Sequence, residues 1–452
     1  MFYSTALPYT PDASSYYRAI ADLPWAVWLD SAGMGRYDIV CAQPVATLVT
    51  QGLHTEIINS AGTRISDDDP YDLLRQQLGQ QIEAVPDIPF AGGAIGYWGY
   101  DLARRTMTLP DFAQADGQIA DMAVAIYDWA VVLDHQCRRA QLVTHQRFSG
   151  TQTLLPGILA RLQRASHSPA DTFTVRQQAT SNFTRDRYAA AFTQIQHYLH
   201  AGDCYQINLA QRYSAAATGN AIDAYLLLRS ISPAPYSAFL NLPQAQILCA
   251  SPERFLRVQG GNVETKPIKG TRPRSTDARK DKELIDELRN HPKDRAENLM
   301  IVDLLRNDLS KSCLPGSVQA PKLFEVESFA NVHHLVSTVI GKLSPGCDAP
   351  HLLRDCFPGG SVTGAPKQRA MEIIEQLEPH RRGLYCGAIG YIGFDGDMDS
   401  NIVIRTLIYS AGQIHCWAGS GIVADSDMTA EYQETLDKAA AMLQLLQHYR
   451  KE

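Results

Sequence analysis

Residues 251–274 read Ser-Pro-Glu-Arg-Phe-Leu-Arg-Val-Gln-Gly-Gly-Asn-Val-Glu-Thr-Lys-Pro-Ile-Lys-Gly-Thr-Arg-Pro-Arg. Apolar residues on both sides of the turn Gly260-Gly261-Asn262 predict two short strands joined in a hairpin. Such a hairpin can bring Glu253 close to Lys269. Because Pro267 and Gly270 bracket Lys269, its backbone is expected to leave the hydrogen-bond ladder, so its side chain can point into a cavity.

A carboxyl group and an amine held together in a pocket form an acid/base and nucleophile pair. The alternative is a surface hairpin that carries an ordinary solvated lysine. These residues alone leave both interpretations open.

The composition is that of a globular protein of two or three domains. The chain has 452 residues, of which 45% are hydrophobic and 20% charged. A net charge of −7 argues against binding to nucleic acid. Met1–Pro11 lacks a secretory signal pattern, and no apolar stretch reaches the roughly 20 residues of a membrane span. The nine cysteines form no Cys-x-x-Cys pair, which predicts free thiols in a reducing cytoplasm.

The pattern along the chain predicts three parts. Residues 1–165 are rich in short apolar segments typical of strands, and 122–127 with 130–133 are expected to form a strand pair. The composition becomes polar over 166–184, which we interpret as a linker. Residues 185–452 then alternate between strand and helix patterns.

One sequence occurs twice. Gly93-Ala-Ile-Gly-Tyr-Trp-Gly-Tyr-Asp101 returns as Gly387-Ala-Ile-Gly-Tyr-Ile-Gly-Phe-Asp395. We interpret the two copies as equivalent strands in two related sheets, one in each half of the chain. Chance similarity between glycine-rich strands is the alternative.

Two expected helices each present a pair of acidic residues near their start. Asp294 and Glu297 lie three residues apart in one, and Glu431 and Glu434 do so in the final helix. Carboxylates from two helices could hold Mg²⁺, which prefers oxygen ligands and keeps positions open for an anionic substrate. The alternative is that these acids only favour the positive ends of the helix dipoles.

Three further segments have patterns suited to ligand binding. Residues 357–367 form a glycine-rich loop before a helix, and 417–423 are expected to form a second glycine loop. Arg405 interrupts the apolar strand predicted over 402–407, so it needs an anionic partner, either a ligand carboxylate or a structural aspartate. His334 ends an apolar stretch and by default is a buried core histidine.

Eight motifs follow one another along the second half of the chain. Together they resemble the chorismate-utilising enzymes, which include anthranilate, isochorismate, salicylate and aminodeoxychorismate synthases. The motifs are Ser-Pro-Glu-Arg-Phe (251–255), Pro-Ile-Lys-Gly-Thr (267–271), Asp-Arg-Ala-Glu-Asn (294–298), His-His-Leu-Val-Ser (333–337), Pro-Gly-Gly-Ser-Val-Thr-Gly-Ala-Pro-Lys (358–367), Ile-Arg-Thr (404–406), Gly-Ser-Gly-Ile-Val (419–423) and Tyr-Gln-Glu-Thr (432–435).

The resemblance implies an α+β fold of large, mostly antiparallel sheets packed as a sandwich with helices outside. It also implies an N-terminal domain over 1–165, loosely similar to that of the family, and a chorismate-binding catalytic domain over 185–452. Lys269 is typical of the aminodeoxychorismate synthase component I branch, because anthranilate and isochorismate enzymes carry a small residue there. Isochorismate-type enzymes carry a water-activating lysine where this chain has Gln206.

For that branch, the resemblance implies amination of chorismate to 4-amino-4-deoxychorismate, a precursor of 4-aminobenzoate and folate. Lys269 would attack the ring and form a covalent intermediate, while Glu253 protonates the departing hydroxyl. Burial and cations must lower the pKa of the lysine, and Mg²⁺, Lys266, Arg272 and Arg274 are the candidate cations.

The resemblance also implies a substrate and metal site. His334 and Thr363 are expected beside the ring, and the role of His334 is open between hydrogen-bond donor and proton carrier. Arg405 and the amide of Gly421 are expected to bind one carboxylate. Mg²⁺ is expected to bind the other carboxylate, held directly by Glu297 and Glu434 and from further out by Asp294 and Glu431.

Two partners complete the expectations. No Gly-x-Cys-x-Gly nucleophile turn occurs, so ammonia is expected from a separate glutaminase subunit. In the same family the N-terminal domain can hold L-tryptophan, and the matching residues here are Ser31, Pro235, Tyr236 and Ser237. Gly35, Arg36 and Tyr37 are further candidates from a loop, 33–37, that is shorter than the related segment. The alternative is that these residues pack the domain interface. Two alternatives remain: an anthranilate synthase, and a non-catalytic sensor of chorismate or tryptophan, although a sensor needs no nucleophile.

Overall fold

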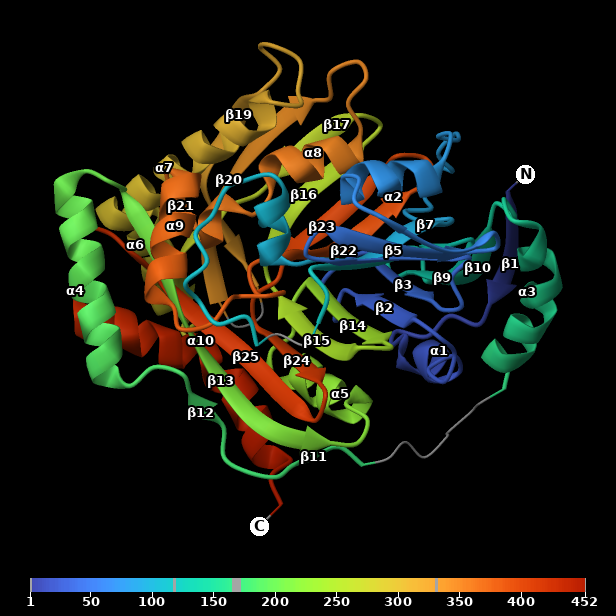
Figure 1. Ribbon diagram of the computed structural model, residues 1–452, viewed down its shortest axis with the longest axis horizontal. Helices are drawn as coiled ribbons and strands as arrows, with labels where there is room; N and C mark the ends of the chain where they lie inside the picture. Colours follow the sequence, from blue (N-terminus) through green and yellow to red (C-terminus); the bar gives the residue numbers. More distant parts are fainter. Residues whose placement is uncertain (1, 117–118, 165–171, 330–331, 452) are drawn as a thin grey trace.

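Two large antiparallel sheets form the centre of the molecule (Figure 1). The computed structural model describes residues 2–116, 119–164, 172–329 and 332–451. The first sheet contains β1 (Tyr3–Leu7), β2 (Ala26–Asp30), β3 (Tyr37–Cys41), β9 (Trp129–Asp134), β10 (Arg139–Thr144), β11 (Thr174–Val175), β12 (Thr180–Ser181), β13 (Gln206–Thr218), β14 (Tyr236–Leu242), β15 (Ala245–Ser251), β21 (Gly364–Ala365), β24 (Thr406–Ser410) and β25 (Gln413–Ile422). Its strand order is β1-β10-β9-β3-β2-β14-β15-β24-β25-β13-β11, with β12 and β21 also paired to β13.

The second sheet has the order β18-β20-β17-β16-β23-β22-β7-β8-β4-β5-β6, with β19 paired to β20. Both sheets combine strands from the two halves of the chain. The division into domains at 1–165 and 185–452 therefore stays a prediction. Part of the predicted linker, 166–171, lies outside the described residues. The strands are β4 (Ala46–Gln51), β5 (His54–Asn59), β6 (Gly62–Ser66), β7 (Gly93–Trp98), β8 (Met122–Tyr127), β16 (Arg254–Gln259), β17 (Asn262–Thr265), β18 (Ile268–Pro273), β19 (Gln319–Ser328), β20 (Val332–Lys342), β22 (Ala388–Gly393) and β23 (Met398–Ile402).

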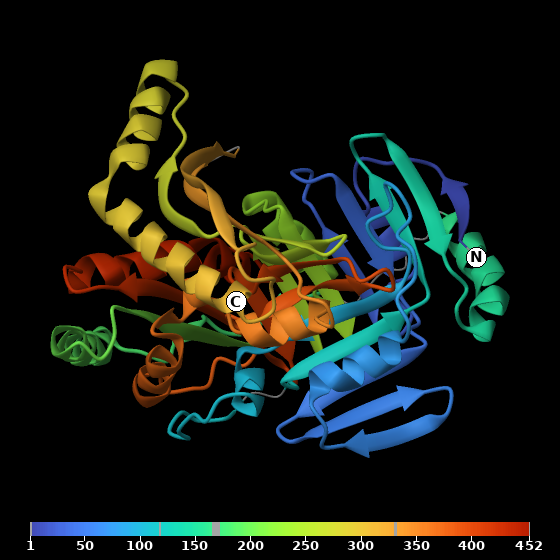
Figure 2. The same cartoon turned by 90° about the horizontal axis from the view of Figure 1, so that it is seen from above.

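Helices cover the outside of the two sheets, as Figure 2 shows for α6 and α7. The α-helices are α1 (Ser14–Arg18), α2 (Pro70–Leu78), α3 (Ser149–Leu162), α4 (Arg185–Ala201), α5 (Ile222–Ile231), α6 (Ala278–Asn290), α7 (Pro292–Ser310), α8 (Ala349–Cys356), α9 (Lys367–Leu377) and α10 (Met428–His448). Two short 3₁₀ helices, η1 (Tyr100–Arg105) and η2 (Gly360–Val362), complete the elements.

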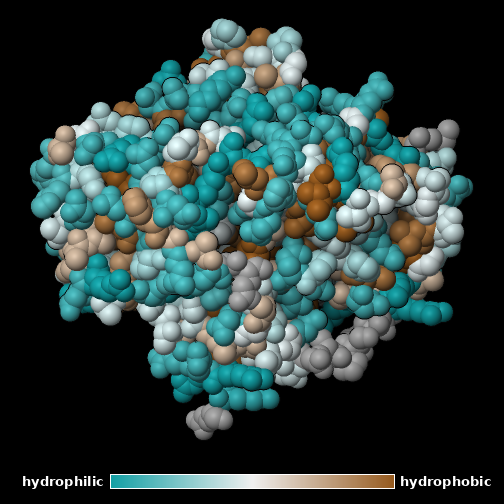
Figure 3. All heavy atoms as spheres, in the orientation of Figure 1, coloured by the Kyte–Doolittle hydropathy of each residue, from teal (hydrophilic) through white to brown (hydrophobic). Residues whose placement is uncertain are grey.

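The core has three parts. Residues from both sheets, such as Ile39 and Ile95, share the largest cluster, so the sheets pack on each other. A second cluster lies between the first sheet and α1, α3, α5 and α10. A third joins α4 and α9 to the start of β13. The outer face in Figure 3 is mostly hydrophilic, with apolar residues in small separate groups.

Local signals in the sequence account for the bounds of α4. The Thr184 hydroxyl accepts a hydrogen bond from the amide of Arg187 and caps α4, while Gly202 ends the helix in a left-handed conformation. Tyr188, Phe192 and Leu199 are buried along one face, with the spacing of an amphipathic helix.

The prediction that the two copies of the repeated sequence lie in separate sheets is wrong. Its two copies, β7 and β22, are direct neighbours in one sheet, with Gly96 opposite Gly390. They therefore do not belong to separate sheets. The glycines are required because a Cβ on Gly390 would lie 2.3 Å from the Asp399 carbonyl oxygen and one on Gly96 would lie 2.2 Å from that of Ala123.

The expected pairing of 122–127 with 130–133 is wrong, because β8 belongs to the second sheet and β9 to the first. Asp128 lies at the crossing between them, and its buried carboxylate accepts hydrogen bonds from the amides of Arg147 and Phe148 and from the Thr151 hydroxyl. These bonds fix the point where the chain changes sheets.

Two composition-based expectations have structural counterparts. All nine cysteines are free thiols. Among the described residues, no helix combines the length and the apolarity that crossing a membrane requires.

Candidate active site

The predicted hairpin is confirmed: β16 and β17 pair antiparallel, with Val258 opposite Val263. Lys269 follows on β18, but β20 lies between β17 and β18. The ladder between β18 and β20 shifts register between Lys269 and Thr271, so Gly270 forms the expected bulge. Gly270 has φ +76°, and a Cβ there would lie 2.8 Å from the Asp294 carboxyl carbon.

The Lys269 amine lies among acidic groups inside the protein. Its Nζ donates a hydrogen bond to the carbonyl oxygen of Ser361 at 3.3 Å. Ser361 belongs to η2 in the glycine-rich segment. Burial lowers the pKa of Lys269, while the charges of Glu297 and Glu253 oppose that shift and the charge of Lys438 adds to it. The charges of a candidate acid, Glu253, and a candidate metal ligand, Glu297, therefore both act on this amine.

Glu253 is 6% exposed at the bend before β16. Its carbonyl oxygen accepts from the amide of Ile402 at 3.0 Å, and its own amide donates to the Ser251 hydroxyl at 3.3 Å. Burial raises the pKa of the Glu253 carboxyl, which favours the protonated acid, although nearby Lys269 lowers it. The sequence-based pairing of Glu253 with Lys269 is thus realised as two neighbouring groups whose charges interact.

Three basic side chains were expected to lower the pKa of Lys269, but each of them is paired with an acid. Lys266 pairs with Glu327 at 2.9 Å, Arg272 with Glu287 at 2.9 Å, and Arg274 with Asp281 at 3.0 Å. Each of these expected cations is neutralised by its own acid. Lys438 was missed, although its position four residues after Glu434 on α10 was the available signal.

The prediction that Arg405 lies inside a strand is wrong. It follows β23 of the second sheet and precedes β24 of the first, where the chain changes sheets, and has a left-handed φ of 51°. Within the described part of the chain, its guanidinium makes no hydrogen bond or ion pair with another side chain, and burial lowers its pKa. A guanidinium without a side-chain partner is suited to binding an anionic ligand.

His334 and Thr363 have their side chains held by neighbours. The His334 Nδ1 lies 2.9 Å from the Thr271 hydroxyl, and burial, assisted by Arg405, lowers the pKa of His334 to about 4. The ring is therefore neutral near pH 7. Thr363 donates its hydroxyl to the Gly359 carbonyl oxygen at 3.1 Å within the glycine-rich segment.

Gly421 lies in β25, so residues 417–422 belong to a strand rather than to the expected loop. The missing side chain leaves space for Gln206 on β13, whose Nε2 would be 3.1 Å from a Cβ on Gly421. The Gln206 amide atoms and the Asn208 Oδ1 are buried without a hydrogen-bond partner among the described residues. They supply unused polar groups beside Gly421, and Asn208 was not expected from the sequence.

The acidic candidates lie on α7 and α10. Burial raises the pKa of Glu297, which Lys269 and Lys293 lower and Glu431 raises. Asp294 differs from the others, because its Oδ2 is 3.2 Å from the Arg272 guanidinium and 3.1 Å from the His291 ring. Among the residues that the structure describes, no three acidic, histidine or cysteine side chains already form a metal-binding group.

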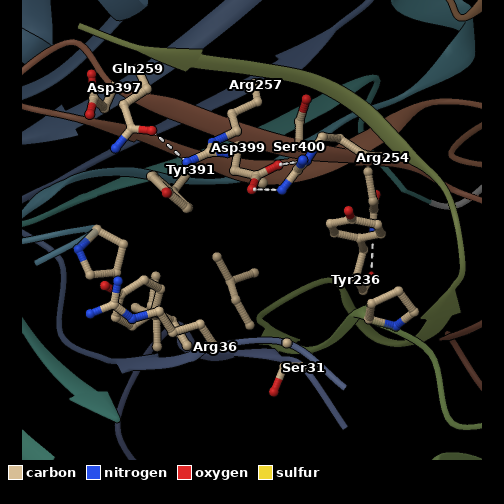
Figure 4. Close-up of a pocket in the computed structure, with 18 of the residues that line it drawn as sticks. Ser31, Arg36, Tyr236, Arg254, Arg257, Gln259, Tyr391, Asp397, Asp399 and Ser400 are labelled. Atoms are coloured by element: carbon tan, nitrogen blue, oxygen red, sulfur yellow. Dashed lines mark hydrogen bonds and ion pairs between the residues drawn. The ribbon is translucent and has the colours of Figure 1, made fainter. Parts of the chain in front are cut away.

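The residues expected to bind tryptophan lie together around a cavity of about 730 Å³ (Figure 4). Arg36 on one wall pairs with Asp134 at 2.8 Å, and Arg254 on another lies over the Tyr236 ring at 5.1 Å. Pro252 and Arg254 face this cavity on either side of Glu253 in the sequence. The expected lining residues are Ser31, Gly35, Arg36, Tyr37, Pro235, Tyr236 and Ser237.

Comparison with known proteins places this site in a family. The sequence model described as "chorismate binding enzyme" matches residues 26–444, a span that contains all the catalytic, substrate and metal candidates. The chain belongs to this family. The resemblance seen in the sequence is therefore confirmed.

Relatives of this chorismate binding enzyme are similar over nearly their full length. The aminodeoxychorismate synthase component 1 of Klebsiella aerogenes is 48% identical over 450 residues, covering 98% of each chain. That of Escherichia coli (strain K12) is 47% identical over 443 residues, covering 96% of each. The anthranilate synthase component 1 of Streptomyces coelicolor is 39% identical over 432 residues, covering 91% of this chain and 81% of that one.

A solved structure confirms the predicted fold. Anthranilate synthase component I from Streptococcus pneumoniae TIGR4 matches with a TM-score of 0.81 and 33% sequence identity, covering 90% of this chain and 92% of that chain. The two antiparallel sheets with outer helices agree with the expected α+β class.

Arg405 gives the first prediction for this chorismate binding enzyme. Arg405→Lys keeps a positive charge but removes the two-pronged donor geometry that suits a carboxylate. We expect the KM for chorismate to rise about tenfold while kcat changes less. Steady-state kinetics would measure both, with Arg257→Lys, on the wall of the other cavity, as the matched control. An unchanged KM in Arg405→Lys would contradict the role.

Proposed function

We propose that the chain is the synthase subunit that converts chorismate and ammonia into 4-amino-4-deoxychorismate, in the synthesis of 4-aminobenzoate and folate. The observation behind this proposal is a half-buried amine, Lys269, whose charge interacts with the buried carboxyl of Glu253, with both pKa values shifted in the directions that this chemistry needs. The names of the relatives at 48% and 47% identity support the same activity.

The reaction uses Lys269 as nucleophile. Its neutral amine forms a bond to ring C2, both ring double bonds shift by one position, and the C4–O bond breaks. Glu253 donates its proton to the departing hydroxyl, which leaves as water. Ammonia then adds at C4, the two double bonds shift back, and the C2–N bond breaks, which returns the lysine as a neutral amine and keeps the enolpyruvyl group. The ammonium group formed at C4 returns one proton to Glu253. Arg405, with the amide of Gly421, holds one carboxylate throughout.

His334 fits the role of a fixed hydrogen-bonding group. With a pKa of about 4, its ring is neutral near pH 7 and is not available as a proton donor in the form of an imidazolium. Its bond to Thr271 keeps the ring orientation beside the bulge that carries Lys269. We assign His334 to positioning the substrate and the proton transfer to Glu253.

Mg²⁺ is the proposed cofactor. The Glu431 Oε2 is buried and has no hydrogen-bond partner in the described chain, which fits a cation that has still to be bound. Glu297, Glu431 and Glu434 would hold the ion, with Asp294 behind them because Arg272 already engages its carboxylate. The bound ion would neutralise the second substrate carboxylate.

Product analysis tests the proposed function. The purified chain, incubated with chorismate, Mg²⁺ and ammonium, is expected to form 4-amino-4-deoxychorismate without pyruvate. Release of pyruvate with formation of anthranilate would establish the second candidate, which the 39% identical anthranilate synthase favours. No turnover would support a sensor.

The proposed partner is a glutaminase subunit that delivers ammonia. The name "component 1" in the relatives indicates that they act with a second component, and this chain has no cysteine in a Gly-x-Cys-x-Gly turn. The free thiols fit the proposed cytoplasmic location. Ammonium alone is expected to replace the partner in the product assay.

L-tryptophan is the proposed ligand of the 730 Å³ cavity. A Cβ on Gly35 would lie 3.0 Å from the Ser31 Cβ, so Gly35→Val would narrow the cavity at that wall. We expect Gly35→Val to weaken tryptophan binding at least about tenfold in calorimetry. L-alanine, which lacks the indole ring, is the control ligand. Equal tryptophan binding by both proteins would place the ligand elsewhere.

A further inference from the structure

The acidic candidates already have a cation between them. The Lys293 Nζ lies 4.0 Å from the Glu297 Oε1 and 3.8 Å from the Glu431 Oε1. Lys293 and Glu297 are both on α7, whereas Glu431 is on α10, so this lysine is a bridge between the two helices. Its distances to the two carboxylates are longer than a strong ion pair, which indicates a shared counter-ion.

Glu431 shows that this arrangement leaves the cluster incomplete. The residue is 5% exposed, and its Oε1 accepts from the Ser426 hydroxyl at 2.6 Å. Its Oε2 is buried with no hydrogen-bond partner in the described residues. An unpartnered carboxylate oxygen in the interior is costly, so Glu431 would gain from a cation that contacts this oxygen directly.

Glu434 forms an ion pair with a second lysine. Its Oε1 lies 2.6 Å from the Lys438 Nζ, one turn further along α10. Lysines of the chain itself, both partly exposed, therefore pair with all three glutamates.

We infer that Lys293 is a resident counter-ion of the acidic cluster, and that a divalent cation must displace it to bind Glu297 and Glu431. This inference rests on the proposed Mg²⁺ site. One ammonium charge is replaced by two charges on a smaller ion that can contact several oxygens directly. The lysine has a way out, since its side chain is 36% exposed and its long stem can turn the ammonium group to solvent.

The displacement has a function for an enzyme whose substrate carries two carboxylates. Without metal, Lys293 limits repulsion between Glu297 and Glu431 and keeps α7 beside α10. With metal, the same carboxylates become ligands and the lysine no longer competes. The resident lysine thus keeps the empty site folded at the expense of metal affinity.

Metal titration tests the inference with the full chain. Mn²⁺ is the probe, followed by electron paramagnetic resonance without chorismate. Lys293→Met removes the charge and keeps most of the stem, so we expect the Kd for Mn²⁺ to fall about tenfold. Lys293→Arg keeps the charge and should bind Mn²⁺ like the wild type. Lys322→Met, which breaks the exposed 3.3 Å pair with Glu325 on β19, is the matched control and should not alter the Kd.

A second measurement separates charge from folding. Without metal, Lys293→Met should unfold at a lower temperature than the wild type, and Mn²⁺ should restore more of the difference than it does for Lys322→Met. An unchanged or weaker Mn²⁺ affinity in Lys293→Met would overturn the inference, as would a wild type that binds no Mn²⁺. If that occurs while chorismate is still aminated, only the inference fails; the absence of aminated product defeats the proposed function.

Discussion

Replacing Lys269 by alanine should abolish the covalent intermediate and lower kcat by about 10³-fold or more, because no other amine occupies the same position. Burial lowers the pKa of Lys269 and so increases its neutral, nucleophilic fraction near pH 7. Mass spectrometry of the chain quenched during turnover should show a chorismate-derived adduct on the peptide containing Lys269 in the wild type and none in the variant.

The matched variant is Lys269→Arg. A guanidinium keeps the positive charge but does not lose its proton in proteins, so it should not restore turnover. Circular dichroism and thermal unfolding should show that both variants keep the fold, since the Lys269 side chain makes one hydrogen bond within the described residues, to the Ser361 carbonyl oxygen. An adduct on another residue, or nearly full activity in Lys269→Ala, would refute the nucleophile assignment.

Glu253→Gln should lower kcat by roughly 10²–10⁴-fold, because the amide has the shape of the carboxyl group but no proton to donate. The KM for chorismate should change little, since the assigned carboxylate contacts come from Arg405 and Gly421. Glu253→Asp, which retains an acid on a shorter stem, is the matched control and should keep more activity than Glu253→Gln. Equal activity in Glu253→Gln and wild type would exclude Glu253 as the acid.

The two pKa shifts also predict the pH profile. In the proposed mechanism the active form has a protonated Glu253 and a neutral Lys269, so the pair has lost one of its two protons. The kcat/KM of the wild type should therefore rise as the pair loses its first proton and fall as it loses the second. In Glu253→Gln only Lys269 titrates, so the residual kcat/KM should rise with pH through the lowered pKa of Lys269 and then stay level.

Local signals explain which elements were predicted well. The bounds of α4 follow from a capping threonine, an apolar stripe and a terminal glycine. The hairpin of β16 and β17 follows from a glycine turn between apolar runs. The bulge at Gly270 follows from the residue types on both sides of Lys269. Each of these features depends on neighbours within a few residues, so periodicity and turn chemistry suffice.

Errors occurred where the chain changes sheets. Strand patterns at β8 and β9 do not show that Asp128 separates them into different sheets. The apolar residues around Arg405 resemble one strand, although the chain crosses there with a left-handed backbone. Pairing of β7 with β22 joins segments almost 300 residues apart in the sequence, and period-2 patterns contain no information about the partner strand.

By itself, the sequence determined the family, the α+β class and the candidate amine, acid and arginine, because motifs of fixed spacing record residue types directly. Only the tertiary structure decided the electrostatic state of those groups. It showed that Lys266, Arg272 and Arg274 are neutralised by their own acids, that Lys438 acts on Lys269, and that Lys293 lies between Glu297 and Glu431. Burial and distances between charges arise from segments brought together by folding, and these quantities set a pKa or an ion's affinity.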